Sequence, residues 1–343
     1  KQKNINRIIF LGLSLLLLVF VFLNLLIGSV SIPIPVFFHL FDAQIPEKEM
    51  VWRHIILESR MPQTITAILA GAALGTAGLQ MQSLFRNPLA GPSILGISAG
   101  ASLGVALVTL SSGWSGGMVS LYFLNDIGIH LSAFLGAFLV LFFVLYAAKK
   151  IRNNASLLII GIMVGYAVSS IIGLLNFMGQ QGEVHAFVIW GLGSFSNVQN
   201  TQLPLFISLV VPALLLSSLL MKPMNAMLLG ESYAQNLGVN LNRIRWQLIL
   251  LSGFLIAIIT AYTGPIAFIG LAVPHIARML FRSSDHKQII PAVIFIGVIV
   301  ALACNLVARL PFFQEALPIN VITSLFGAPL VIYLIVKRKQ IGF

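Results

Sequence analysis

The side chains that could do chemistry in this sequence are its histidines, its carboxylates and one cysteine. The six histidines show neither a Glu-x-x-His spacing nor close pairing, so no set of metal ligands is predicted. Cys304 lies in an apolar run, which rules out a disulfide framework and a cysteine-based metal cluster. Since no nucleophile or base is suitably placed either, we expect no catalytic residue, no bound metal and no enzymatic activity.

A phosphate-binding loop is also missing from the sequence. The string from Gly191 to Ser194 is rich in glycine, but it lacks the lysine and the strand-to-helix setting that hold phosphate. We therefore expect no cofactor on this chain, and any ATP and Mg²⁺ must be bound by a partner subunit that hydrolyses the ATP.

The elements that position these side chains must lie in a membrane. Of the 343 residues, 58% are hydrophobic and 8% are charged, and the mean hydropathy is +0.99. An ordinary soluble domain carries about 25% charged residues. The net charge of +11 does not indicate nucleic-acid binding, because no basic stripe is interleaved with aromatic residues.

Apolar runs between polar, Gly and Pro breaks predict about ten transmembrane helices. The first run is too long for a signal peptide and no cleavage site follows it. The breaks at 31–60 and 221–245 are long enough for short helices. The fold class is thus an all-α integral membrane protein with a single transmembrane domain, 1–343. Its expected spans are 8–30, 61–84, 94–112, 131–148, 155–177, 203–220, 246–263, 266–282, 289–308 and 318–336.

The basic residues divide unequally between the two sides of this map. Of the 20 Lys and Arg residues, 16 fall on the side of the N-terminus, and the other four are Lys48, Arg53, Arg60 and Arg309. Because positive residues are retained in the cytoplasm, both termini are expected there. No charge lies near the middle of a span, which argues against a proton-coupled carrier, although carriers that use sodium and backbone carbonyls stay open.

Small residues recur closely at 71–78 and 96–104, which predicts close helix packing rather than contact with a substrate. The Gly91-Pro92 string faintly echoes the Gly264-Pro265 string. This similarity fits an inverted repeat of the kind found in transporters, and it fits chance equally well.

Several strings, in order from about Arg60 to the C-terminus, resemble the iron-siderophore, haem and vitamin B12 permease family of ABC importers. They are Arg86-Asn87-Pro88-Leu89-Ala90-Gly91-Pro92 with Leu95-Gly96, Trp190 to Ser194, Gly230-Glu231 with Leu237-Gly238-Val239, Gly264 to Leu271, Pro274 to Arg278, Leu317-Pro318-Ile319, and Gly327-Ala328-Pro329.

The resemblance implies a type II ABC importer permease that works by alternating access in the bacterial cytoplasmic (inner) membrane. It implies a homodimer with the pathway on its axis, two cytoplasmic ATPase subunits and one periplasmic or lipid-anchored binding protein. The expected cargo is a ferric siderophore or haem, with a corrinoid such as vitamin B12 as the alternative. An ion-coupled secondary carrier is the distant alternative.

The resemblance also assigns expected roles to individual residues. The coupling segment, about 228–245, would dock on the ATPase, although an ordinary linker stays open; its matching residues are Gly230, Glu231, Ala234, Leu237 and Gly238. The turn after the second span would be structural, through Asn87, Pro88, Leu89 and Pro92.

On the outer side, Arg60, Arg309 and Glu315 are expected to orient a binding protein, with anchoring of the arginines at the membrane interface as the alternative. Gln63 and Ala316 depart from the family pattern there. The translocation path is expected to run along the fifth and tenth spans, with packing against a neighbouring helix as the alternative for each candidate; the candidates are Met163, Tyr166, Asn176, Phe177 and Met178.

Overall fold

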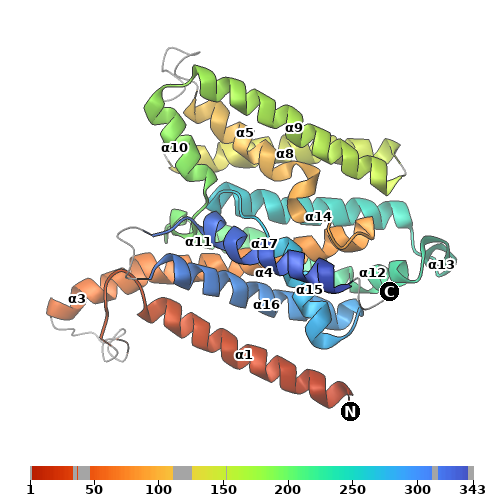
Figure 1. Cartoon of the computed structure of the whole chain (residues 1–343), viewed down its shortest axis with the longest axis horizontal. Coiled ribbons are helices and arrows are strands. Elements are labelled where there is room, and N and C mark those ends of the chain that lie inside the picture. The colour runs from red at the N-terminus through yellow and green to blue at the C-terminus, as the bar shows by residue number, and fades with distance from the viewer. Residues whose placement is uncertain are drawn as a thin grey trace.

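The computed structural model describes residues 2–33, 37, 47–110, 126–151, 153–310 and 316–338. Within these ranges the regular structure is entirely helical (Figure 1). Each predicted span contains one helix, so the prediction of about ten helices in these positions is confirmed. They are α1 (Gln2–Leu26), α4 (Met61–Phe85), α5 (Ile97–Thr109), α8 (Asp126–Lys150), α9 (Asn154–Met178), α11 (Leu203–Leu219), α14 (Leu241–Thr263), α15 (Ile269–Phe281), α16 (His286–Ala308) and α17 (Ile319–Arg338).

These helices differ in whether they are long enough to cross a membrane. In the described residues, six pass on length and composition, and a seventh passes if α11 is counted together with α12 (Met221–Leu228), which follows it at a bend of 45°. The apolar helices α5 and α15 are shorter. The reason is local, because α5 begins only after Gly96 (φ 75°) and α15 only after Phe268 (φ 66°).

Short helices occupy the two long breaks, as predicted. On one side α3 (Glu47–His54) and the π-helical turn η1 (Ile55–Arg60) lead into α4, and on the other α12 is followed by α13 (Glu231–Asn236). Two further elements lie between the predicted spans and were not expected: α10 (Gln181–Gly191) and the 3₁₀ turn η3 (Phe195–Asn197). A capping box between Gln180 and Glu183 marks the start of α10, and that pair is a local signal that could have been found.

The centre of the fold is α4, which is buried along nearly its whole length, whereas α1 and α9 are largely exposed. Glycines on α4 let α15 and α16 approach it closely. A methyl group on Gly71 would overlap the carbonyl oxygen of Gly297 on α16, and one on Gly78 would overlap that of Gly270 on α15. Interfaces of this kind hold helices together where the hydrophobic effect is weak.

A second contact of the same kind joins α5 to α8. A methyl group on Gly104 would overlap the backbone of Ser132, and one on Gly136 would overlap the carbonyl oxygen of Gly100. The packing role predicted for the two small-residue stretches is therefore confirmed.

Candidate functional site

The coupling segment projects from one end of the helix bundle, where α12 and α13 lie beside the start of α14 (Figure 1). Gly230 (φ 117°) and Gly238 (φ 81°) bracket α13, and an added methyl group would meet nothing within 4 Å at either position. Glycine is therefore required there by the backbone conformation and not by crowding. Because α14 begins at Leu241, the last residues of the expected 228–245 segment belong to this long helix.

The outer surface of this segment is apolar. Leu228, Leu229, Tyr233 and Leu237 are all between 51% and 66% exposed, while Ala234 is fully buried beneath them. Large apolar side chains gathered on a projecting segment are typical of an interaction surface. The structure thus brings the five predicted coupling residues together on one short helix and its two ends.

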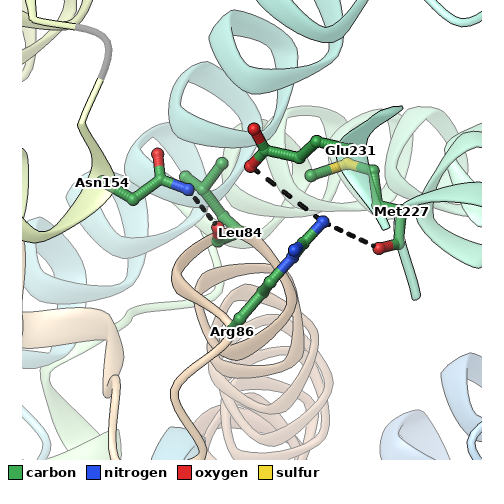
Figure 2. A network of polar contacts seen from close by, with 5 residues as sticks. All are labelled: Leu84, Arg86, Asn154, Met227 and Glu231. Atoms are coloured by element: carbon green, nitrogen blue, oxygen red, sulfur yellow. Dashed lines mark hydrogen bonds and ion pairs between the residues drawn. The ribbon is translucent and has the colours of Figure 1, made fainter. Parts of the chain in front are cut away.

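Arg86 connects this segment to the central helix (Figure 2). It ends α4 in the left-handed conformation (φ 47°), and its Nη2 donates to the carbonyl oxygen of Met227 at 3.1 Å. The same nitrogen lies 4.0 Å from Oε1 of Glu231. Both side chains are about half exposed, so the ion pair itself contributes little to stability and serves mainly to position α13 against α4.

The same end of α4 is also tied to α9. Nδ2 of Asn154 donates to the carbonyl oxygen of Leu84 at 3.0 Å, two residues before Arg86 (Figure 2). Side-chain contacts thus join the end of α4, the most buried helix of the fold, to both α13 and the start of α9.

A second connection runs through a buried histidine that the sequence analysis did not single out. His286 at the start of α16 contacts Asn225 Oδ1 of α12 through Nδ1 at 2.8 Å, and Ser83 Oγ of α4 through Nε2 at 2.9 Å. The amide of Asn225 donates to Asp285 at 2.6 Å, which fixes its oxygen towards His286. Nδ1 must then carry the proton, and Nε2 accepts from the Ser83 hydroxyl.

Asp285 binds the Asn225 amide and is also the N-cap of α16. Its carboxylate accepts from the backbone N–H of Lys287 at 2.9 Å and from the Asn225 amide. The Lys287 hydrogen bond, which stabilises the charged form, is the main reason why the pKa of Asp285 lies below its usual value; the Asn225 bond acts in the same direction, and partial burial opposes both.

The predicted turn lies directly after α4. Asn87 Oδ1 accepts from the backbone N–H of Leu89 at 2.9 Å, and the carbonyl oxygen of Pro88 contacts His275 Nε2 of α15 at 2.8 Å. Pro92 begins the 3₁₀ turn η2 (Pro92–Leu95), and its ring fills the space that a methyl group on Gly270 would need. The turn is thus locked onto α15, in keeping with a structural role.

At the opposite end of the bundle, the Arg60 side chain forms hydrogen bonds to the backbone of its own chain. Its side chain is only 2% exposed, and Nη1 donates to the carbonyl oxygens of Leu25, at 2.9 Å, and Leu26, while Nη2 donates to that of Val30. These bonds end α1 at Leu26, four residues earlier than predicted. Arg60 is thus buried against the end of α1 in this structure, and docking through it stays a prediction.

Arg309 and Arg60 both lie next to Gly28. A methyl group on Gly28 would lie 3.1 Å from Nη2 of Arg309 and 3.0 Å from Nη2 of Arg60. Burial, and then the charge of Arg60, lower the pKa of Arg309 to about 10. The two arginines line a pocket of about 330 Å³ together with serines 29, 59, 194 and 196. Glu315, the third expected docking residue, lies outside the described residues, and docking through Arg309 stays a prediction.

Four of the candidate pathway residues lie on the uncovered surface of α9. Met163, Tyr166 and Met178 are between 46% and 67% exposed, and Phe177 is 88% exposed. Asn176 differs, because it is partly buried and its Oδ1 has no hydrogen-bond partner among the described residues. Large apolar side chains left bare on one helix indicate that lipid, a pathway or another chain covers them.

Comparisons with known proteins fit this architecture. A model described as the FecCD transport family matches residues 16–337. The chain is 32% identical to a hemin transport system permease of Yersinia pestis over 85% of its length and 86% of the relative's. It is 35% identical to a vitamin B12 import system permease of Klebsiella pneumoniae over 84% of each. A solved structure assigned to the metal-chelate type of ABC transporters, in an inward-facing conformation, superposes with a TM-score of 0.83 at 30% identity and covers 96% of this chain and 99% of that one.

The fold and the projecting segment define a multi-pass membrane permease. With the family model matching nearly the whole chain, the protein belongs to the FecCD transport family and is the non-enzymatic permease subunit of an ABC transporter.

Proposed function

We propose that this chain forms the membrane pathway of an importer for a metal chelate, with a ferric siderophore as the first candidate and haem as the second. Vitamin B12 is the alternative cargo. The relatives of this chain support this class of cargo, since they include a hemin permease, a vitamin B12 permease and a metal-chelate transporter.

The observation that carries the proposed mechanism is the junction of Arg86 with Met227 and Glu231. It joins an exposed apolar segment, suited to dock on an ATPase, to the most buried helix of the fold. Energy supplied by ATP hydrolysis in a partner can thereby move α4 as a rigid body, which is what alternating access needs.

The assembly we propose has two copies of this chain, two ATPase subunits and one binding protein. The bare face of α9, which carries Tyr166 and Phe177, offers a surface on which a second copy can pack. The excess of Lys and Arg on the side of α12 and α13 supports a location in the bacterial cytoplasmic membrane with both termini and the ATPases in the cytoplasm.

The test is ATP-dependent uptake into liposomes that contain this chain, its genomically adjacent ATPase and its binding protein. Ferric siderophore, haem and cobalamin are offered in parallel, and one of the three should accumulate only when ATP is supplied. Accumulation driven by an ion gradient in vesicles that hold this chain alone would contradict the proposal and identify a secondary carrier.

Docking is tested separately by Glu231→Arg, which places a second positive charge beside Arg86 and should reduce the amount of ATPase that co-purifies. Glu58→Arg makes the same charge change on η1 at the opposite end of the chain and should leave co-purification unchanged. If both variants retained as much ATPase as the wild-type chain, α13 would be an ordinary linker.

A further inference from the structure

Helices α8 and α14 run antiparallel. His130 stacks on Tyr262 with ring centroids 4.8 Å apart, and Phe138 meets Phe254 edge to face at 6.0 Å. Later residues of α8 thus contact earlier residues of α14. It follows that the end of α8, with Lys149 and Lys150, lies beside the start of α14.

At that end the two helices enclose an apolar groove of about 420 Å³. Phe142 and Tyr146 of α8 line one wall, and Trp246 and Leu250 of α14 line the other. Phe142 and Tyr146 are 73% and 57% exposed, so the groove is open to its surroundings rather than sealed within the core.

The charge around the groove is positive. Lys149 is the one charged side chain among its described lining residues. Lys150 places its Nζ 4.8 Å from the centroid of Tyr146, and Arg243 is exposed one turn before Trp246 on α14. Aromatic rings with basic residues at their level mark the boundary between hydrocarbon and headgroups.

We propose that this groove binds an anionic phospholipid. One acyl chain lies along Phe142 and Leu250, and the phosphate is held by Lys149 at the level of Tyr146 and Trp246. Basic pockets between membrane helices recognise anionic headgroups in this way, since the acyl chain supplies apolar contact and the lysine supplies selectivity. A zwitterionic lipid fits the groove equally well but gains less from Lys149.

The position of Trp246 in the wall allows a direct test. The variant Trp52→Phe, Trp114→Phe, Trp190→Phe keeps Trp246 as the one tryptophan of the four and is reconstituted in phosphatidylcholine vesicles. Phosphatidylglycerol with brominated acyl chains should quench its fluorescence at about fivefold lower mole fraction than brominated phosphatidylcholine, the selectivity expected from one basic side chain at an anionic headgroup.

Lys149→Gln in the same background should abolish this preference. Lys222→Gln, which removes an exposed lysine of α12 at the same end of the bundle, should keep it. Equal quenching by the two lipids before any lysine is changed would overturn the proposal. Absence of quenching would also overturn it, because the groove would then be covered by protein, such as a second copy of this chain.

A second measurement avoids the tryptophan replacements. Native mass spectrometry of the wild-type chain, purified from vesicles with equal amounts of the two lipids, should show retained phosphatidylglycerol that Lys149→Gln loses and Lys222→Gln retains. Equal retention of both lipids by the wild type would contradict the proposal.

Discussion

Gly71 on α4 and Gly297 on α16 meet backbone to backbone, so that a methyl group on either would overlap the carbonyl oxygen of the other. The two residues are far apart in the sequence, and both belong to ordinary apolar helices. Their contact sets the distance between the central helix and one of its main neighbours.

Gly71→Ala should therefore destabilise the protein by about 1–3 kcal/mol, because α4 and α16 must separate to admit the methyl group. Gly12→Ala is the matched control, since Gly12 is also inside a helix, α1, and a methyl group there meets nothing within 4 Å. Thermal unfolding in detergent should show a lower midpoint for Gly71→Ala alone, and equal midpoints for the two variants would contradict the close crossing.

Arg86→Ala should weaken coupling between ATP hydrolysis and transport in the reconstituted importer, because the contacts of α4 with Met227 and Glu231 are lost. The ratio of substrate moved to ATP hydrolysed should fall, while assembly with the ATPase persists. Arg282→Ala is the control: Arg282 ends α15 in the same left-handed conformation (φ 47°) and is exposed.

The charge exchange Arg86→Glu with Glu231→Arg refines this test. If the two side chains act as a pair, the double variant should recover part of the ratio that each single variant loses. Strictly additive losses would show that the Met227 hydrogen bond, and not the ion pair, makes the connection.

His286→Ala should cost about 2 kcal/mol, because it opens a cavity and leaves the Ser83 hydroxyl without the imidazole, whereas Asn225 keeps its hydrogen bonds to the backbone N–H of residue 286 and to Asp285. His185→Ala, at an exposed position on α10, should change the unfolding midpoint little. Hydrogen exchange should also rise at the start of α16 in the His286 variant, and protection equal to wild type there would argue against the connection.

Asp285 should make stability depend on acid pH. Its pKa is lower folded than unfolded, so its contribution is complete above the unfolded value and is lost as the pH falls through the folded one. At neutral pH Asp285→Ala should be less stable than wild type by about 1 kcal/mol, the usual loss for an N-cap, and the gap should narrow as the carboxyl protonates. A gap that stays constant down to pH 3 would contradict the role of the carboxylate.

The class of protein, the positions of the ten helices and the short helix between Gly230 and Gly238 could all be predicted from the sequence. Each of these depends on local features: an apolar run must become a helix in lipid because its backbone groups have no other partners, and Gly230 and Gly238 mark the ends of a short helix. The strings shared with the permease family pointed to the same segment.

Only the tertiary structure decided which side chains act together. Arg60 was expected to face a partner, yet it is buried against the end of α1, and the connections of Arg86 with Met227 and of His286 with Ser83 had no sequence signal. The physical reason is that such hydrogen bonds depend on the register and rotation of helices that are distant in sequence. Hydropathy indicates whether a segment can lie in the membrane, but it does not show which way each side chain faces.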